Sequence, residues 1–249
     1  MNKFGRLYGV GIGPGNTELL TIKAKNILNL VDVIFTPRSA PKRDSIARKI
    51  IEPVLNGKAQ VRELIFPMTK DKGELEKHWV EAASEVTNVL RHGKDAAFVT
   101  LGDPFFYSTY IYLYEKLKES YSSLEIVTLP GISSAFASAS AAGVPIAIGD
   151  EKVAVIPLPR DTQIIRPYLD MFETLIILKV GDKLKGLVEV LEKAGLVDQA
   201  ILVQKVSQVG EERIVYDLTE LTEGDLNEVG YLSTVIIKHK PIYKVKEKR

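Results

Sequence analysis

Near the amino terminus, residues 7–15 read Leu-Tyr-Gly-Val-Gly-Ile-Gly-Pro-Gly. The apolar residues of 7–12 are typical of a buried strand, and the glycines around them are typical of a tight turn. A helical pattern follows, because apolar side chains recur at Leu20, Ala24 and Ile27, which is the spacing of one helix face. This stretch therefore predicts a strand, a glycine-rich turn and a helix, the repeating unit of an α/β fold.

The same alternation continues through the first half of the chain. Apolar stripes that start at Leu75 and Tyr110 predict two more helices, and Gly93 is expected to end the first of them. Alternating strands and helices favour a mostly parallel sheet. Further strands of that sheet are expected at 31–35, 61–65, 96–101 and 124–129.

The second half is less regular and predicts a second domain. A helix that starts near Leu184 is expected to end at Gly195, and no long helical pattern separates the last two strands, which favours antiparallel pairing. We expect an N-terminal α/β domain at 1–128 with a mostly parallel sheet and a C-terminal, mixed-sheet α+β domain at 129–249. Strands of the second domain are expected at 153–156, 175–178, 200–206, 214–218 and 234–238.

The composition is that of a soluble globular protein. The 249 residues include 33 basic and 32 acidic side chains, so the overall charge attracts neither nucleic acid nor an anionic membrane. The absence of cysteine excludes disulfides and thiolate chemistry and suits a reducing cytoplasm. The segment 136–148 is too short to cross a bilayer, and the start of the chain has no signal-peptide pattern. We expect a cytoplasmic protein without nucleic-acid or membrane partners.

Three junctions share one design, in which a buried strand runs into a glycine-containing turn and then a helix. They lie at 9–15, 101–104 and 129–134. If the first and fourth strands flank the point where the strand order reverses, two of these turns face one crevice at the carboxyl edge of the sheet. Glycines there let a ligand approach the backbone, whose amides act as donors. The junctions are therefore the candidate ligand site.

Other chemistries find little support in the sequence. A dinucleotide-binding G-x-G-x-x-G pattern would need glycine where Pro14 or Asn16 stands, although Asp32 falls near the position of a ribose-binding acid. Neither a G-x-S-x-G elbow nor a phosphate-binding G-x-x-x-x-G-K-[ST] loop is present. No metal-ligand spacing connects the three histidines, His78, His92 and His239.

Some of the junction residues also have a purely structural interpretation. Asp103 and Pro104 form a typical helix start, with aspartate as the N-cap and proline in the first helical position. Ser133 and Ser134 are equally good N-caps. A helix N-terminus leaves backbone amides free, so the structural and ligand-binding roles are compatible.

At these three junctions the chain resembles the tetrapyrrole (corrin/porphyrin) methylase family. The segment 7–15 followed by 18–21 resembles the family's first motif, Gly102-Asp103-Pro104 its second, and 130–134 its third. Within the family, further segments resemble the branch that methylates C20 of precorrin-2 or cobalt-factor II in cobalamin biosynthesis. These segments are 36–39, 66–71 with Trp79 downstream, and 106–109.

The resemblance implies a homodimer that binds S-adenosylmethionine in a cleft between the two domains. It implies a set of cofactor-binding residues, of which Val180 is the least typical because many family members have methionine there. In the first domain and at its end, these residues are Pro14, Leu101, Gly102, Asp103, Phe106, Ser133 and Ser134. In the second domain they are Val180, Lys205, Val206 and Ser233, with Lys179 beside them.

The expected reaction is methyl transfer from a sulfonium to a tetrapyrrole carbon, which needs alignment more than a strong acid or base. No general base is assigned, and Asp103 is a candidate to orient the cofactor's ammonium group or ribose hydroxyls. Two alternatives stay open: another methylase of this fold, including diphthine synthase, and a nucleotide-binding module without catalysis. Basic and polar side chains are candidates to contact the acceptor and its carboxylates: Arg38, Lys42, Arg43, Tyr107, Ser108 and Thr109.

Overall fold

The computed structural model describes residues 4–40 and 45–239, with the side chains of 227 and 228 left out. The chain divides into two compact units, Met1–Ser133 and Ser134–Arg249. Within the described residues, no helix is both long and apolar enough to cross a membrane.

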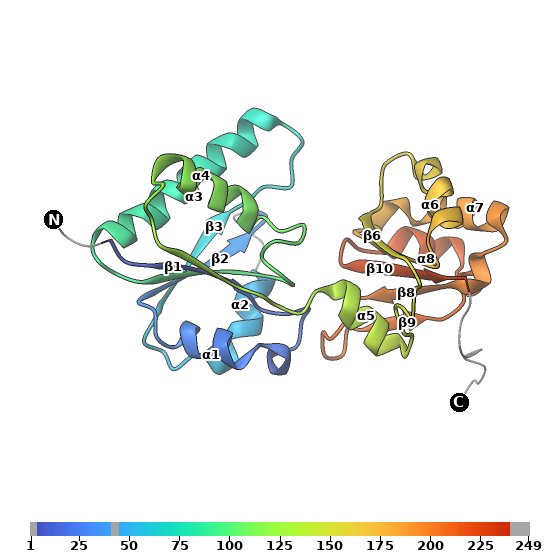
Figure 1. Ribbon diagram of the computed structural model, residues 1–249, viewed down its shortest axis with the longest axis horizontal. Coiled ribbons are helices and arrows are strands. Elements are labelled where there is room, and N and C mark those ends of the chain that lie inside the picture. The colour runs from blue at the N-terminus through green and yellow to red at the C-terminus, as the bar shows by residue number, and fades with distance from the viewer. Residues whose placement is uncertain (1–3, 41–44, 240–249) are drawn as a thin grey trace. The chain divides into compact units, whose positions relative to one another are not determined.

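The first unit is built on a five-stranded sheet in the order β3-β2-β4-β1-β5, and every neighbouring pair is parallel, as the sequence predicts (Figure 1). β1 and β4 are neighbours, but the chain leaves β1 toward β2 and leaves β4 toward β5, in opposite directions. The strand order therefore reverses between β1 and β4. The strands are β1 Leu7–Gly11, β2 Val33–Arg38, β3 Gln60–Ile65, β4 Ala96–Thr100 and β5 Ile126–Leu129.

Helices cover both faces of this sheet (Figure 1). One face packs against α1 and α2 and the other against α3 and α4, each through its own apolar cluster. α3 begins where the Asp71 side chain accepts a hydrogen bond from the Glu74 amide, and it ends before Gly93, which adopts a φ of 73°. The helices are α1 Ile22–Leu28, α2 Ile46–Ile51, α3 Lys72–Arg91 and α4 Tyr110–Ser120. The sequence patterns predicted all of these helices except α2.

The second unit contains a mixed sheet in the order β6-β7-β10-β8-β9. β6 and β7 are parallel, whereas the three other pairs are antiparallel, which confirms the mixed sheet predicted for this half. Its strands are β6 Val153–Pro157, β7 Thr174–Leu178, β8 Ala200–Gln204, β9 Arg213–Val215 and β10 Ser233–Lys238.

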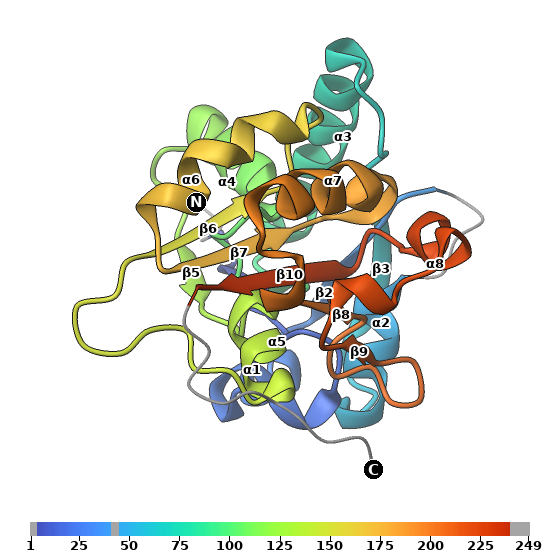
Figure 2. The same cartoon turned by 90° about the vertical axis from the view of Figure 1, so that its right-hand side faces the viewer.

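The helices of the second unit lie on opposite faces of its sheet (Figure 2). α6, α7 and α8 share the larger apolar cluster, and α5 packs on the other face through Ala137 and Ala142. α7 ends at Gly195, which has the left-handed φ of 68° expected of a helix stop. The helices are α5 Ser134–Ala142, α6 Arg166–Met171, α7 Leu184–Ala194 and α8 Glu223–Glu228. Short 3-10 turns occur at Thr17–Leu19, Glu52–Val54, Thr162–Ile165, Gly181–Lys183, Val197–Gln199 and Leu218–Glu220.

A buried lysine holds the segment between α5 and β6 onto the second sheet. Lys238 on β10 is 3% exposed, and its Nζ donates to Glu151 Oε2 at 2.6 Å and Thr174 Oγ1 at 3.2 Å. The hydrogen bonds that Glu151 accepts from Lys238 and from the Ile148 amide lower its pKa. Desolvation of the carboxylate acts in the opposite direction but is the smaller effect. A carboxyl with a lowered folded pKa stabilises the fold above its unfolded pKa and loses that effect as the pH falls.

Replacing Lys238 with methionine is expected to lower the melting temperature at pH 7, because Glu151 keeps its charge and loses its partner. The difference from the wild type should shrink as the pH falls through the folded pKa of Glu151, where the carboxyl becomes neutral in both proteins. Thermal unfolding followed by circular dichroism between pH 7 and pH 3 measures this. Lys185→Met, which removes an exposed ion pair with Glu223 at 3.6 Å, is the matched control and should change little. If the difference in melting temperature between the Lys238 variant and the wild type stays the same from pH 7 to pH 3, the proposed stabilising pair of Lys238 and Glu151 is contradicted.

Candidate active site

The turns that follow β1 and β4 are joined by backbone hydrogen bonds at the carboxyl edge of the first sheet. The Ile12 amide donates to the Thr100 carbonyl at 3.0 Å, and the Gly102 amide donates to the Gly13 carbonyl at 2.9 Å. Gly13 and Gly102 form an isolated bridge, and both have left-handed φ angles of 76° and 69°. The two turns therefore lie side by side where the strand order reverses, as the sequence predicts.

The third turn, which follows β5, is held to the second by Asp103. Asp103 Oδ2 accepts a hydrogen bond from the Gly131 amide at 3.1 Å, and its Oδ1 accepts one from the Phe105 amide at 2.9 Å. One carboxylate therefore fixes the shape of its own turn and connects that turn to the next. This arrangement assigns to Asp103 a structural role in the site.

Close backbone contact makes glycine necessary at two of these positions. A Cβ at Gly131 would lie 2.2 Å from the Gly102 carbonyl oxygen, and a Cβ at Gly11 would lie 2.6 Å from the Gly131 nitrogen. At Gly102, in contrast, a Cβ would meet only the Cα of Ser133, at 3.8 Å. A side chain there would enter the space between the second and third turns, and glycine leaves that space open for a ligand to reach the backbone.

The residues predicted to bind a cofactor in the first unit all lie on these three turns. Pro14 and Ser133 are buried. The other members are partly buried: Leu101, Gly102, Asp103 and Phe106. Ser134 is the first residue of α5, so Ser133 stands at the position before that helix.

The helix start predicted at Asp103 and Pro104 is wrong. α4 begins at Tyr110, and the residue at its N-cap is Thr109. Asp103 instead opens a turn, in which the Phe106 amide donates to the Asp103 carbonyl at 3.3 Å. The aspartate side chain accepts a hydrogen bond from a nearby backbone amide both in turns and at helix N-caps. The local sequence therefore does not distinguish the two.

The candidate acceptor residues after this turn have different environments. Tyr107 is exposed and adopts a left-handed φ of 54°, a conformation uncommon for a residue with a side chain. Ser108 is buried, shares a hydrogen bond of 2.7 Å with Thr100 Oγ1 and accepts one from the Tyr110 amide. Thr109 is partly buried and makes no capping hydrogen bond. Tyr107 and Thr109 are therefore more accessible than Ser108.

In the second unit, the predicted cofactor residues gather at one edge of the sheet. Val180 follows β7, Lys205 and Val206 follow β8, and Ser233 begins the antiparallel β10 between those strands. The Val180 amide donates to the Ser233 carbonyl at 3.4 Å. Because Val180 and Val206 belong to the buried apolar clusters, their backbone groups are the parts suited to contact a ligand.

Three non-glycine residues near this edge have left-handed backbone conformations. The φ angles are 56° at Lys179, 46° at Lys205 and 63° at Ser207. Lysine has a Cβ and gains nothing locally from this conformation, and such residues cluster at functional sites when the surrounding structure fixes them. The sequence gives no local signal for this strain.

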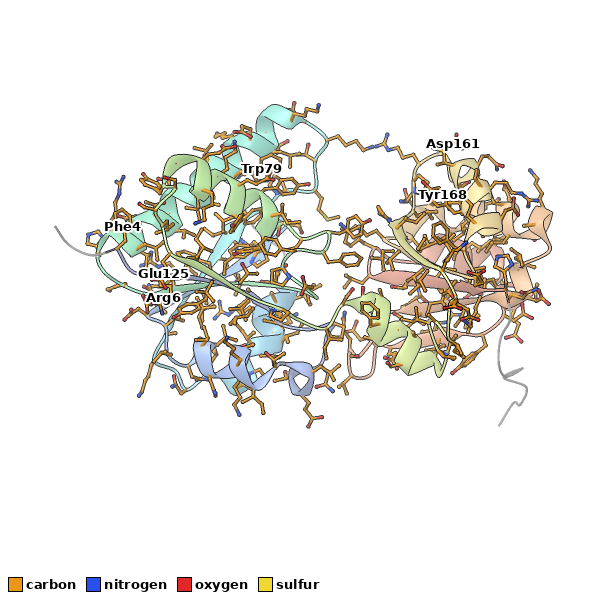
Figure 3. The ribbon with its side chains drawn as sticks, viewed as in Figure 1. Phe4, Arg6, Trp79, Glu125, Asp161 and Tyr168 are labelled. Atoms are coloured by element: carbon orange, nitrogen blue, oxygen red, sulfur yellow. The ribbon has the colours of Figure 1, made fainter. Side chains whose placement is uncertain are left out.

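The opposite, amino edge of the first sheet does not resemble a nucleotide site. Asp32 precedes β2, and its Oδ2 accepts a hydrogen bond from the Asp95 amide at 2.9 Å. Arg6 and Glu125, which precede β1 and β5, pair at 2.6 Å on the same edge (Figure 3). Asp32 is thus on the far edge from the glycine turns, and the ribose-binding role considered for it is wrong.

The candidate basic residues are only partly described. Arg38 ends β2, and its Nη1 lies 2.7 Å from Oε2 of Glu63 on β3. Glu63 was not among the predicted site residues, because its partner is 25 positions away in the chain and the pairing depends on strand register. Lys42 and Arg43 lie outside the described residues. No cluster of metal ligands occurs within 4–40 and 45–239.

Trp79 has a packing role. Its ring, labelled in Figure 3, belongs to α3. The ring stacks on Tyr112 of α4 with centroids 4.3 Å apart and planes inclined by 5°. Phe66, from the segment that resembles the C20 branch, packs edge-on against Phe98 of β4. The first contact joins α3 to α4, and the second packs the segment after β3 against β4.

A buried tyrosine lies beneath the turns. Tyr110 has no exposed surface, and its hydroxyl lies 2.8 Å from Thr128 Oγ1. Burial raises the pKa of the Tyr110 hydroxyl to about 12. The hydrogen bond with Thr128 lowers this pKa, but by less than burial raises it. Because the folded pKa lies above the unfolded value, stability should decrease as the pH rises from 10 toward 12.

We expect this loss to be about 1.4 kcal/mol at pH 11, one pH unit above the unfolded pKa. Tyr110→Phe should be less stable than the wild type at pH 8, since Thr128 loses its partner, and the gap should narrow at pH 11. Urea unfolding at the two pH values measures both quantities, with Tyr112→Phe, an exposed tyrosine on the same helix, as the control. A gap of constant size would show that Tyr110 does not titrate in this range.

The fold and these turns define a class: α/β proteins that bind a ligand at the carboxyl edge of a parallel sheet, where the strand order reverses. Residues 6–222 match the family of tetrapyrrole (corrin/porphyrin) methylases, and the chain belongs to that family.

Three known proteins illustrate the relationship. The chain is 41% identical to a probable cobalt-precorrin-2 C(20)-methyltransferase of Methanocaldococcus jannaschii, over 96% of this chain and 98% of that protein. It is 32% identical to the cobalt-precorrin-2 C(20)-methyltransferase of Salmonella typhimurium, over 94% and 96%. The structure of uroporphyrin-III C-methyl transferase from Thermus thermophilus, complexed with S-adenyl homocysteine, matches with a TM-score of 0.64 and 21% identity, over 94% of this chain and 98% of that one.

Proposed function

We propose that this chain is an S-adenosylmethionine-dependent methyltransferase that adds a methyl group to C20 of precorrin-2 or of its cobalt form, in cobalamin biosynthesis. The observation that carries the proposal is the contact of three glycine turns at the edge where the strand order reverses. Membership of the methylase family and 41% identity to a C20-methyltransferase over nearly the whole chain support the substrate.

When bound, S-adenosylmethionine supplies an electrophilic methyl group. The contribution of the chain is to position the cofactor and the acceptor, which can lower a barrier by about 7–11 kcal/mol. Near the turns, the Asp103 oxygens accept backbone hydrogen bonds, and the Tyr110 hydroxyl, like that of any tyrosine, is protonated at neutral pH. Catalysis in this proposal depends on alignment and not on a general base.

Cofactor binding is assigned to residues of both units. In the first unit, Gly102 leaves room for the ligand and Asp103 holds the turns in place. In the second, the backbone around Val180, Lys205 and Ser233 supplies the remaining contacts. The acceptor is assigned to Arg38, Tyr107 and Thr109, with Lys42, Arg43 and Ser108 as further candidates.

The deciding experiment offers the purified protein precorrin-2 and, separately, its cobalt form, each with S-adenosylmethionine. Mass spectrometry should detect one added methyl group, and NMR with a ¹³C-labelled methyl donor should locate it at C20. Titration calorimetry should show binding of S-adenosylhomocysteine and no binding of NAD. Binding of S-adenosylhomocysteine without turnover of either acceptor would refute the assigned substrate, and absence of binding would refute the enzyme class.

The active form is proposed to be a cytoplasmic homodimer. This follows from the family resemblance and from the chemistry of a cysteine-free chain that acts on a metabolic intermediate. Light scattering after size-exclusion chromatography should give twice the 27.6 kDa mass of the chain. A mass of one chain at micromolar concentration would contradict it.

A further inference from the structure

The carboxyl end of β2 carries a polar group of side chains outside the three turns. Thr36 and Arg38 are two residues apart on the strand, and Glu63 on β3 is the cross-strand partner of Thr36. Residues in these relationships share one face of a sheet. It is the face of Ile34, which belongs to the same apolar cluster as Ala47 of α2.

Two guanidinium groups flank the single carboxylate of Glu63. Arg38 Nη1 lies 2.7 Å from Oε2, and Arg48 Nη1 lies 3.9 Å from Oε1. Arg48 also approaches Glu52 at 3.9 Å, but that carboxylate is 66% exposed and solvent weakens the pair. The Arg48 side chain is itself 46% exposed, so solvent also weakens its approach to Glu63, and Arg38 is the guanidinium group that Glu63 holds firmly.

Two polar atoms of this group lack partners. Thr36 Oγ1 and Arg38 Nε are buried, and neither makes a hydrogen bond with any residue the structure describes. Buried polar groups are nearly always paired, so an unsatisfied pair on one face needs an explanation, and a ligand is one. The Arg38 side chain is 26% exposed, so part of it reaches the surface.

The geometry of the guanidinium group specifies the ligand. With Nη1 held by Glu63, the remaining donors of Arg38 are Nε and Nη2, the side-on pair that matches the two oxygens of a carboxylate. A fixed guanidinium loses less freedom on binding than a mobile one. The arrangement favours a planar, two-oxygen anion over a single-point contact.

The position of this group relates it to the candidate site in the same unit. β2 pairs with β3 through Arg38 but with β4 only through Phe35. Beyond Phe35, the side of β2 that faces β4 has no strand partner among the described residues, and β4 continues directly into the turn of Gly102 and Asp103. The polar group therefore stands at the same carboxyl edge as the three turns.

We propose that Arg38 binds a peripheral carboxylate of the tetrapyrrole acceptor and that Glu63 is a positioning residue that orients its guanidinium group. The inference rests on the proposed function, since it takes the acceptor from it. Arg38 was already a candidate from the sequence. The role of Glu63 is inferred from the register of β2 and β3 and from the unpaired Thr36 Oγ1 and Arg38 Nε.

The test compares Glu63→Gln, Arg38→Lys and the double variant with the wild type. Kinetics measure KM for each substrate and kcat, and equilibrium titration measures acceptor binding in the presence of S-adenosylhomocysteine, where no turnover occurs. Both single variants should raise the acceptor KM and Kd about tenfold, the effect of losing one charge-assisted contact. The double variant should be no worse than Arg38→Lys, and KM for S-adenosylmethionine and kcat should stay within about twofold.

Glu85→Gln is the matched control. Glu85 pairs with Arg62 at 3.6 Å, and Arg62 is the neighbour of Glu63 on β3, facing the other side of the sheet. This control should leave all constants unchanged. Unchanged acceptor binding in Glu63→Gln would overturn the role of Glu63. The role would also be overturned if KM rose equally for the acceptor and for S-adenosylmethionine while the melting temperature fell. A wild type that binds S-adenosylhomocysteine but methylates no acceptor would instead refute the proposed function.

Discussion

Gly131→Ala is expected to abolish methyl transfer and to weaken S-adenosylhomocysteine binding about a hundredfold or more. The added Cβ would lie 2.2 Å from the Gly102 carbonyl oxygen and 2.8 Å from the Cα of Gly11, and both obstacles are backbone atoms. The three turns must therefore separate, and a displacement near 1 Å in an aligned site can cost a factor of about 100. Titration calorimetry and the methylation assay measure the two effects.

The control for this variant is Gly224→Ala on α8, where the nearest atom to an added Cβ is Thr222 Oγ1 at 3.6 Å. That distance is an ordinary contact, and alanine is the better helix former, so binding and activity should match the wild type. Circular dichroism should show that the Gly131 variant keeps its secondary structure, because the change is confined to the turns. Wild-type affinity in a folded Gly131→Ala protein would show that the contact of the turns does not shape the cofactor site.

Asp103→Ala is expected to reduce kcat/KM about tenfold to a hundredfold, because two backbone amides lose a charged acceptor. The amide of Gly131 would no longer be tied to the second turn, and the amide of Phe105 would lose the bond that shapes that turn. Steady-state kinetics and calorimetry with S-adenosylhomocysteine measure the loss.

Asp103→Asn separates positioning from direct contact with the cofactor. The asparagine amide oxygen can still accept one of the two backbone hydrogen bonds, so a positioning role predicts activity between the wild type and the alanine variant. A direct contact with the cofactor's ammonium group depends on the negative charge, so asparagine would then be as poor as alanine. Full activity in Asp103→Ala would exclude both roles.

The sequence predicted most of the fold because the signals for its strands and long helices are local. The apolar run before Gly11 and the stripe of α3 each specify an element within one window of the chain. α2 escaped prediction because it has only six residues, and its stability comes from the burial of Ala47, Ile50 and Ile51 against the sheet. Short helices stabilised by tertiary packing leave a weak periodic signal.

The parts of the candidate site that depend on the turn-forming glycines could be predicted from the sequence. The parts that depend on how neighbouring strands align could not. Glycines 11, 102 and 131 stand out in the sequence, and the structure brings them into contact. The cross-strand pairing of Arg38 with Glu63 and the strained backbone of Lys179 arise from contacts distant in the chain, which one sequence does not reveal. Asp103 was a candidate from the sequence, but its hydrogen bonds to the Phe105 and Gly131 amides become visible only in the folded structure.

The mutual contact of the three glycine turns also limits how this enzyme could be redesigned. Since the backbone of the neighbouring turns fills the space that a side chain at Gly11 or Gly131 would need, neither the first nor the third turn can be exchanged alone for one that lacks this glycine. A graft from another methylase would have to bring all three together. The ends of β2 and β3 are free of this constraint, so a protein engineer seeking a different acceptor should start at Arg38 and Glu63.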